Sequence, residues 1–112
     1  MKTSELTGAA LDWAVAKCEG KGDDCEVHAG NVLYGRVTSG FVHYNPSTNW
    51  AQGGPIIERE LMSSEYSGVW RYFATCGGVN FMGVGPTPLI AAMRCLVASK
   101  LGDEVEIPEE LL

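Results

Sequence analysis

Positive charge is scarce in this chain. Eight lysines and arginines stand against fourteen aspartates and glutamates, so the 112 residues carry a formal net charge of −6 at pH 7. Binding to nucleic-acid phosphates or to an anionic membrane surface depends on basic residues, so neither partner is expected. No apolar run approaches the roughly 18 residues of a membrane-spanning helix, and residues 1–5 lack the apolar stretch of a signal peptide. We therefore expect a soluble cytoplasmic domain.

The sequence also lacks the cysteine spacing of a metal site. Cys18, Cys25, Cys76 and Cys95 include no C-x2-4-C pair of the kind that zinc sites use. A disulfide framework is not expected without an export signal, so we predict reduced, mostly buried thiols, no metal and no cofactor. His28 and His43 have no Ser or Asp in triad spacing; structural, surface and ligand-contact roles remain open for both.

Two segments carry strong helical signals. Residues 4–18 have an amphipathic pattern that Thr3 or Ser4 can cap, and the same pattern places Asp12 outside the apolar face. Residues 87–101 have a cap at Thr87, a proline at the first helical position and a glycine, Gly102, that ends the helix. Both segments are predicted to be main helices of the fold.

Runs of β-branched and aromatic residues predict short strands between these helices. Gly30, Gly35 and Gly40 separate the early runs and suit turns or bulges, whereas Gly77 and Gly78 suit a hairpin turn between the last two runs. Alternation in residues 105–107 predicts a final strand. The runs cover residues 25–28, 32–34, 36–38, 41–44, 69–74 and 79–84.

A polar loop is predicted over residues 45–55. Ser47, Thr48 and Asn49 can cap a turn or short helix within it. Residues 56–61 then favour a short helix begun by Pro55 at its first position, with a strand as the alternative. Together these patterns indicate one α+β domain over residues 1–112, in which two main helices pack on a small antiparallel sheet. Exposed edge strands of such a sheet make a homo-oligomer plausible.

Three segments resemble a known family. The stretch YNPSTNWAQGGPIIERE at residues 44–60, the stretch TPLIAAMRC at residues 87–95 with its continuation to Gly102, and the opening LDWAVAK at residues 11–17 are similar to the bacteriophage NinX-like family. The resemblance implies a NinX-like domain and a small accessory protein made in an infected bacterium. It implies no catalytic residues.

The 44–60 segment is the strongest candidate for a binding site. Its aromatic faces, hydroxyls and amides suit a flat polar ligand, and its glycines allow a ligand or another backbone to approach closely. The start of the 87–101 helix and Arg94 can neutralise an anionic group. The predicted ligand-binding residues are Tyr44, Ser47, Thr48, Asn49, Trp50, Gln52, Gly53, Gly54, Arg59, Thr87 and Arg94.

Structural alternatives exist for the same residues. The loop can be pinned to the core by a buried Trp50, and Arg94 can pair with Glu58 or Glu60. Glu58 and Glu60 could act as an acid and a base, but their spacing is common in solvated segments.

The function favoured by the sequence is non-enzymatic binding of a small, nucleotide-type ligand, such as a host immune signal that a phage protein sequesters. The alternative is an adaptor that inhibits or retunes a host protein, with its acidic surface facing a basic one. A hydrolase is disfavoured because no nucleophile–base pair is evident.

Overall fold

The computed structural model describes residues 1–21, 25–36 and 40–112. Its helices are α1 (Gly8–Cys18), α2 (Trp50–Arg59) and α3 (Pro88–Leu101), with short 3-10 helices at Thr3–Glu5 and Glu109–Leu111. Its strands are β1 (Cys25–His28), β2 (Asn31–Arg36), β3 (Gly40–His43), β4 (Ser63–Tyr66), β5 (Trp70–Cys76) and β6 (Val79–Gly85).

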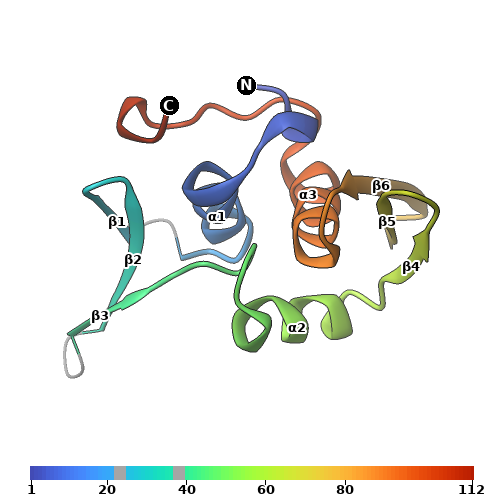
Figure 1. Cartoon of the computed structure of the whole chain (residues 1–112), viewed down its shortest axis with the longest axis horizontal. Coiled ribbons are helices and arrows are strands. Elements are labelled where there is room, and N and C mark those ends of the chain that lie inside the picture. The colour runs from blue at the N-terminus through green and yellow to red at the C-terminus, as the bar shows by residue number, and fades with distance from the viewer. Residues whose placement is uncertain (22–24, 37–39) are drawn as a thin grey trace.

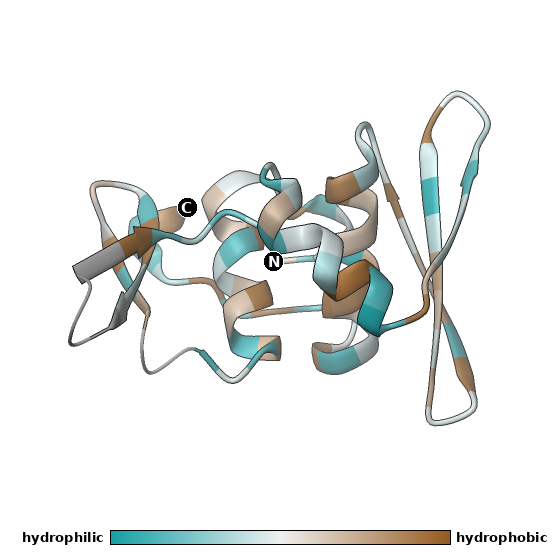
Figure 2. Ribbon diagram, turned by 90° about the horizontal axis from the view of Figure 1, so that it is seen from below, coloured by the Kyte–Doolittle hydropathy of each residue, from teal (hydrophilic) through white to brown (hydrophobic). Residues whose placement is uncertain are grey.

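The strands form two separate antiparallel sheets, ordered β1-β2-β3 and β4-β5-β6. Figure 1 and Figure 2 show them at opposite ends of the molecule, with the helices between them. The α+β class is as predicted, but the single sheet expected from the sequence is wrong. The chain leaves β3, forms α2 along one edge of the molecule and only then enters β4, so each group of strands pairs within itself (Figure 1).

Helix α3 is the centre of the core. Leu89, Met93, Leu96 and Val97 are buried, as the predicted apolar face requires. Thr87 caps the helix by accepting a hydrogen bond from the Ile90 N–H over 3.2 Å, and Gly102 follows its last residue. The cap, the proline and the terminal glycine predicted for this helix are therefore confirmed.

Glycines in β6 allow α3 to lie directly against the second sheet. A Cβ atom at Gly83 would overlap the carbonyl oxygen of Ala91, and one at Gly85 would lie 2.8 Å from the Ala91 nitrogen. Tyr72 and Ala74 of β5 are buried on the same face. β5 and β6 pair across the Gly77–Gly78 turn as predicted.

The first helix differs from the prediction at its start. Thr3 does not cap it, because the Thr3 hydroxyl donates to the Gly102 carbonyl over 2.6 Å and residues 3–5 form a separate 3-10 turn. The helix begins at Gly8 after Thr7. Asp12, placed outside by its sequence pattern, is only 4% exposed. The helical periodicity of apolar residues could not show that the 44–49 segment covers the side of α1 that carries Asp12.

The 45–55 segment is more helical than predicted. Asn49 caps α2 by accepting a hydrogen bond from the Ala51 N–H over 2.9 Å, so the helix begins at Trp50 and Pro55 lies inside it. Pro55 is exposed, so water can reach the Ala51 carbonyl that lacks its usual donor.

Other strand predictions need correction. Gly35, predicted in a turn, lies within β2 opposite Phe41. Residues 105–107 form no strand; a β-bridge pairs Lys2 with Glu104, and backbone hydrogen bonds of Met1 with Val105 and of Thr3 with Asp103 flank it. Strand β4 was not predicted, since its four residues are all exposed and carry no apolar alternation. The strand predicted at residues 36–38 falls mostly outside the described residues.

Of the four cysteines only Cys95 is buried, and the other three are half-buried, so the prediction of mostly buried thiols is wrong. Burial still controls the chemistry of Cys18 and Cys95. It raises the pKa of Cys18 to about 12 and that of Cys95 to about 11, so both thiols stay protonated at neutral pH. In the part of the chain that the structure describes, no group of three or more His, Cys, Asp or Glu residues could hold a metal ion. No helix among those same residues is long and apolar enough to cross a membrane.

Candidate functional site

A pocket of about 260 Å³ forms where the 45–49 turn meets the starts of α2 and α3. Its lining comes from Ser47 and Thr48 of the turn, Trp50 of α2, and residues 87–90 at the start of α3. We call it the Trp50 pocket. It brings together four of the predicted ligand-binding residues from two distant parts of the sequence: Ser47, Thr48, Trp50 and Thr87.

Trp50 is open to solvent in this pocket. Its exposed fraction is 55%, although large aromatic side chains are usually well buried. The alternative in which a buried Trp50 pins the loop to the core is therefore wrong. An exposed indole face beside a hollow can stack on a flat ligand.

Ser47 lies beneath the same pocket and is only 1% exposed. Its backbone N–H donates to Oδ1 of Asp12 over 2.9 Å. Burial raises the pKa of Asp12, while interactions with the Ser47 hydroxyl and N–H and the charge of His43 partly offset that rise. The Ser47 Oγ nevertheless has no partner in full hydrogen-bonding geometry. The interaction with Asp12 accounts for this buried hydroxyl, which solvent does not reach.

Gln52 holds the turn in place. Its Oε1 accepts from the Asn45 N–H over 2.6 Å, and its Nε2 donates to the His43 carbonyl over 2.8 Å. Tyr44 is buried in the core, with its ring 6.5 Å from that of Tyr34. Together with Asn49, the α2 cap, these residues support the turn and do not line the pocket.

Of the two glycines of α2, only Gly53 is required by packing. A Cβ atom at Gly53 would lie 2.5 Å from the Pro46 carbonyl oxygen and 2.7 Å from Cδ2 of Leu89. At Gly54 the nearest atom would be Cε3 of Trp50, at 3.8 Å. The close approach that the sequence suggested is therefore made by the protein's own backbone at Gly53.

Arg59 belongs to an ion-pair network away from the Trp50 pocket. It contacts both carboxylate oxygens of Glu19 at 2.7 Å, and its Nε contacts Glu60 at 3.0 Å. Hydrogen bonds to Glu19 and Glu60 raise the pKa of Arg59. Lys100 reaches Glu60 at 3.3 Å. This arrangement joins the C-terminal ends of all three helices.

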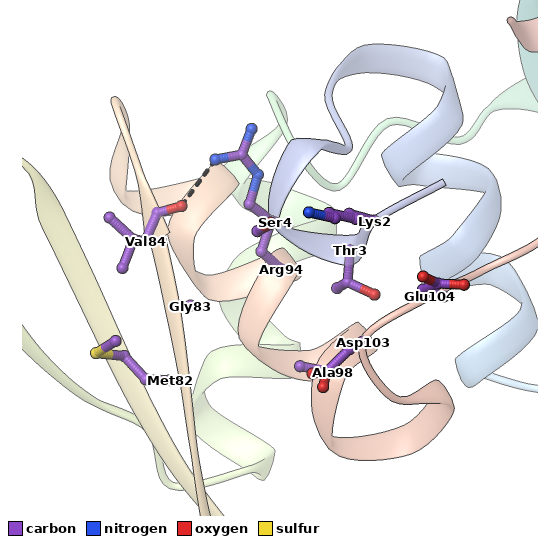
Figure 3. A pocket seen from close by; sticks show the side chains of 10 residues that line it. All are labelled: Lys2, Thr3, Ser4, Met82, Gly83, Val84, Arg94, Ala98, Asp103 and Glu104. Carbon is purple, nitrogen blue, oxygen red and sulfur yellow. Dashed lines mark hydrogen bonds between the residues drawn. The ribbon is translucent and has the colours of Figure 1, made fainter.

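Arg94 also lies away from the Trp50 pocket. Its Nε donates to the Leu6 carbonyl over 2.9 Å and its Nη1 to the Val84 carbonyl over 2.8 Å, the second of which Figure 3 marks. Burial lowers its pKa. Two expectations are wrong: Arg94 does not pair with Glu58 or Glu60, and it lines a different pocket from Thr87.

Sequence reasoning missed the apolar side of the Trp50 pocket. Pro88, Leu89 and Ile90 follow the cap of α3 and were interpreted only as the start of a helix. Their proximity to the turn depends on the contact between Gly53 and Leu89, and no local pattern indicates that contact.

The comparison with curated proteins gives no match. A family model described as "Bacteriophage P22, NinX" matches residues 2–100, which include the whole turn, α2 and nearly all of α3. The Trp50 pocket therefore lies entirely within the matched region. The chain belongs to this NinX family.

Proposed function

We propose that this phage accessory protein binds a small polar ligand with a planar ring, of nucleotide type, and holds it without transforming it. The observation that carries the proposal is the exposed Trp50 beside the exposed Thr48 in one pocket. The indole offers a stacking face, and the Thr48 hydroxyl offers a donor or acceptor for a polar ring edge.

The other lining residues suit a neutral ring better than a phosphate. Pro88 and Ile90 supply apolar surface. The start of α3 is a weak anion site, because Pro88 lacks an N–H and Thr87 already accepts from the Ile90 N–H. The volume lies near the lower end of small-molecule pockets, which favours a single base over a whole dinucleotide.

Binding without chemistry fits the composition of this pocket. Its lining includes no His, Cys or carboxylate that could act as a general base. For a phage protein, tight binding of a nucleotide-type immune signal would be useful in itself, because sequestration lowers the free signal in the host cytoplasm.

Isothermal titration with adenosine monophosphate, ADP-ribose and a cyclic dinucleotide tests the proposal. Trp50→Ala should weaken a hit by roughly 5- to 150-fold, the range expected for losing one base–aromatic stack. Because Trp50 is exposed, the variant should keep its fold. Tyr66→Ala is the matched control, since Tyr66 is an exposed aromatic residue on β4 with 62% exposure. Equal effects of the two substitutions, or binding by no compound of the panel, would count against the proposal.

One observation favours the adaptor alternative. Leu61 follows α2 with a positive φ of 53° and is 86% exposed, so an apolar side chain is displayed at a backbone position that favours glycine. Leu61→Gly should stabilise the fold by about 0.5–1 kcal/mol. If it also abolishes capture of a host protein while nucleotide binding is unaffected, the adaptor role gains support.

A further inference from the structure

A second pocket, of about 300 Å³, lies on another side of α3 and contains Arg94. Its walls come from four segments: residues 2–4, residues 82–84 of β6, Arg94 and Ala98 of α3, and residues 103–104. We call it the Arg94 pocket; Figure 3 shows it from close by. Hydrogen bonds fix two of these walls together, because Thr3 Oγ1 donates to the Gly102 carbonyl and the Thr3 N–H donates to the Asp103 carbonyl.

Arg94 has an unusual electrostatic setting within the described chain. Arg59 pairs with Glu19 and Glu60, and Arg71 lies 3.8 Å from Glu65. No carboxylate among residues 1–21, 25–36 and 40–112 lies within 4.0 Å of the Arg94 guanidinium. Arg94 instead uses Nε and Nη1 to bond two backbone carbonyls, which fix the plane of the group without neutralising its charge.

The pocket holds two cations and two carboxylates. Figure 3 shows the Arg94 guanidinium at the upper left, the Lys2 ammonium to its right, the Glu104 carboxylate farther right and Asp103 below, and Lys2 faces Glu104 across a β-bridge. The Arg94 side of the pocket suits an oxyanion, because the held guanidinium and the exposed Lys2 ammonium can both donate to it. The other side suits hydroxyl groups, which donate to carboxylates.

We infer that the Arg94 pocket binds a phosphorylated sugar, with the phosphate at Arg94 and Lys2 and the sugar hydroxyls at Asp103 and Glu104. A phosphate supplies the counter-charge that Arg94 lacks, and its several oxygens can contact both cations at once. The pocket volume is appropriate for one sugar phosphate. This inference is independent of the function proposed for the Trp50 pocket.

Isothermal titration with ribose 5-phosphate, inorganic phosphate and ribose tests the inference. Ribose 5-phosphate should bind more tightly than inorganic phosphate, and uncharged ribose should bind least. Lys2→Gln should weaken ribose 5-phosphate binding by about two- to fivefold, as expected for an exposed charge contact. Lys17→Gln is the matched control, because it removes the same charge from an exposed lysine that lies 4.9 Å from the Trp13 ring and outside the pocket.

Arg94→Gln should weaken binding by roughly tenfold or more, since it removes a charge-assisted contact. This variant also disturbs the bonds to Leu6 and Val84. If it fails to fold, the comparison of Lys2→Gln with Lys17→Gln tests the inference in its place. Glu104→Gln should lower the preference for ribose 5-phosphate over inorganic phosphate. Trp50→Ala should leave the binding of both unchanged.

Two results would overturn the inference. The first is an equal effect of Lys2→Gln and Lys17→Gln, which would mean that only the overall charge matters. The second is an equal affinity for ribose 5-phosphate and inorganic phosphate, which would remove the role of the two carboxylates.

Discussion

The carboxylate of Asp12 in α1 accepts a hydrogen bond from the backbone N–H of Ser47, 35 residues later, over 2.9 Å. Both residues are buried, at 4% and 1% exposure. This bond fastens the turn before α2 onto the first helix. It also holds Ser47, which lines the Trp50 pocket, in place, so the geometry of the pocket depends on a residue that does not line it.

Two substitutions of Asp12 should distinguish the contribution of its charge to stability from the contribution of its hydrogen bond. Asp12→Ala removes the acceptor of the buried Ser47 N–H and should cost about 1–3 kcal/mol of unfolding free energy. Asp12→Asn keeps an oxygen acceptor but has no charge. Urea unfolding of both variants and of the wild type measures the difference.

The Asp12→Asn comparison should depend on pH. Burial raises the pKa of Asp12 in the folded state above its unfolded value, so the folded protein binds the proton more tightly. The wild type therefore loses stability as pH rises from the unfolded pKa through the folded one, and the variant lacks this loss. The stability difference should shift toward Asp12→Asn over the pH range above the unfolded pKa of about 4. A stability difference between the wild type and Asp12→Asn that stays constant over this range would contradict a raised pKa for Asp12.

Adjacent glycines in α2 should respond to alanine in opposite directions. Gly53→Ala places a methyl group against the Pro46 backbone, which cannot move aside easily, and should cost about 1–3 kcal/mol or more. Gly54→Ala meets only an ordinary contact with Trp50 and should stabilise the helix by about 0.5–1 kcal/mol. Thermal or urea unfolding gives both values. Similar effects of the two substitutions would show that α2 does not pack against Pro46 as described.

Substitution of Gln52 should lower the free energy of unfolding, because this residue supports the turn and does not line the pocket. Gln52→Ala removes the bonds to the Asn45 N–H and to the His43 carbonyl, with an expected loss of about 1–2 kcal/mol. Thr48→Ala, at an exposed neighbouring position with weak bonds of 3.3 and 3.4 Å, should change stability by less than about 0.5 kcal/mol. A Gln52→Ala variant as stable as Thr48→Ala would mean that the turn does not depend on the two Gln52 hydrogen bonds.

The elements that were predictable from sequence are those with local signals. Thr87, Pro88 and Gly102 mark both ends of α3, and the glycine pair 77–78 marks the hairpin between β5 and β6. Failures occurred where a tertiary contact overrides the local pattern. Asp12 is buried by a segment 35 residues away, and Thr3 bonds to Gly102 in place of capping a helix.

The candidate site was predictable in part for the same reason. The composition of residues 44–60 indicated polar and aromatic groups, but it could not separate Trp50, which lines the pocket, from Gln52 and Tyr44, which support the turn. Nothing local indicates that residues 2–4 and 103–104 lie beside Arg94, because that arrangement depends on how the two ends of the chain meet.

The most direct test of the Trp50 pocket is a nitrogen-15 NMR titration with adenosine monophosphate, observing the indole N–H signals of the three tryptophans. Trp13 and Trp70 line no part of the Trp50 pocket and serve as internal controls. The proposed function predicts that the Trp50 indole signal shifts with saturable dependence on ligand concentration while the other two stay in place. An unchanged Trp50 signal at saturating ligand, or equal shifts of all three signals, would contradict it.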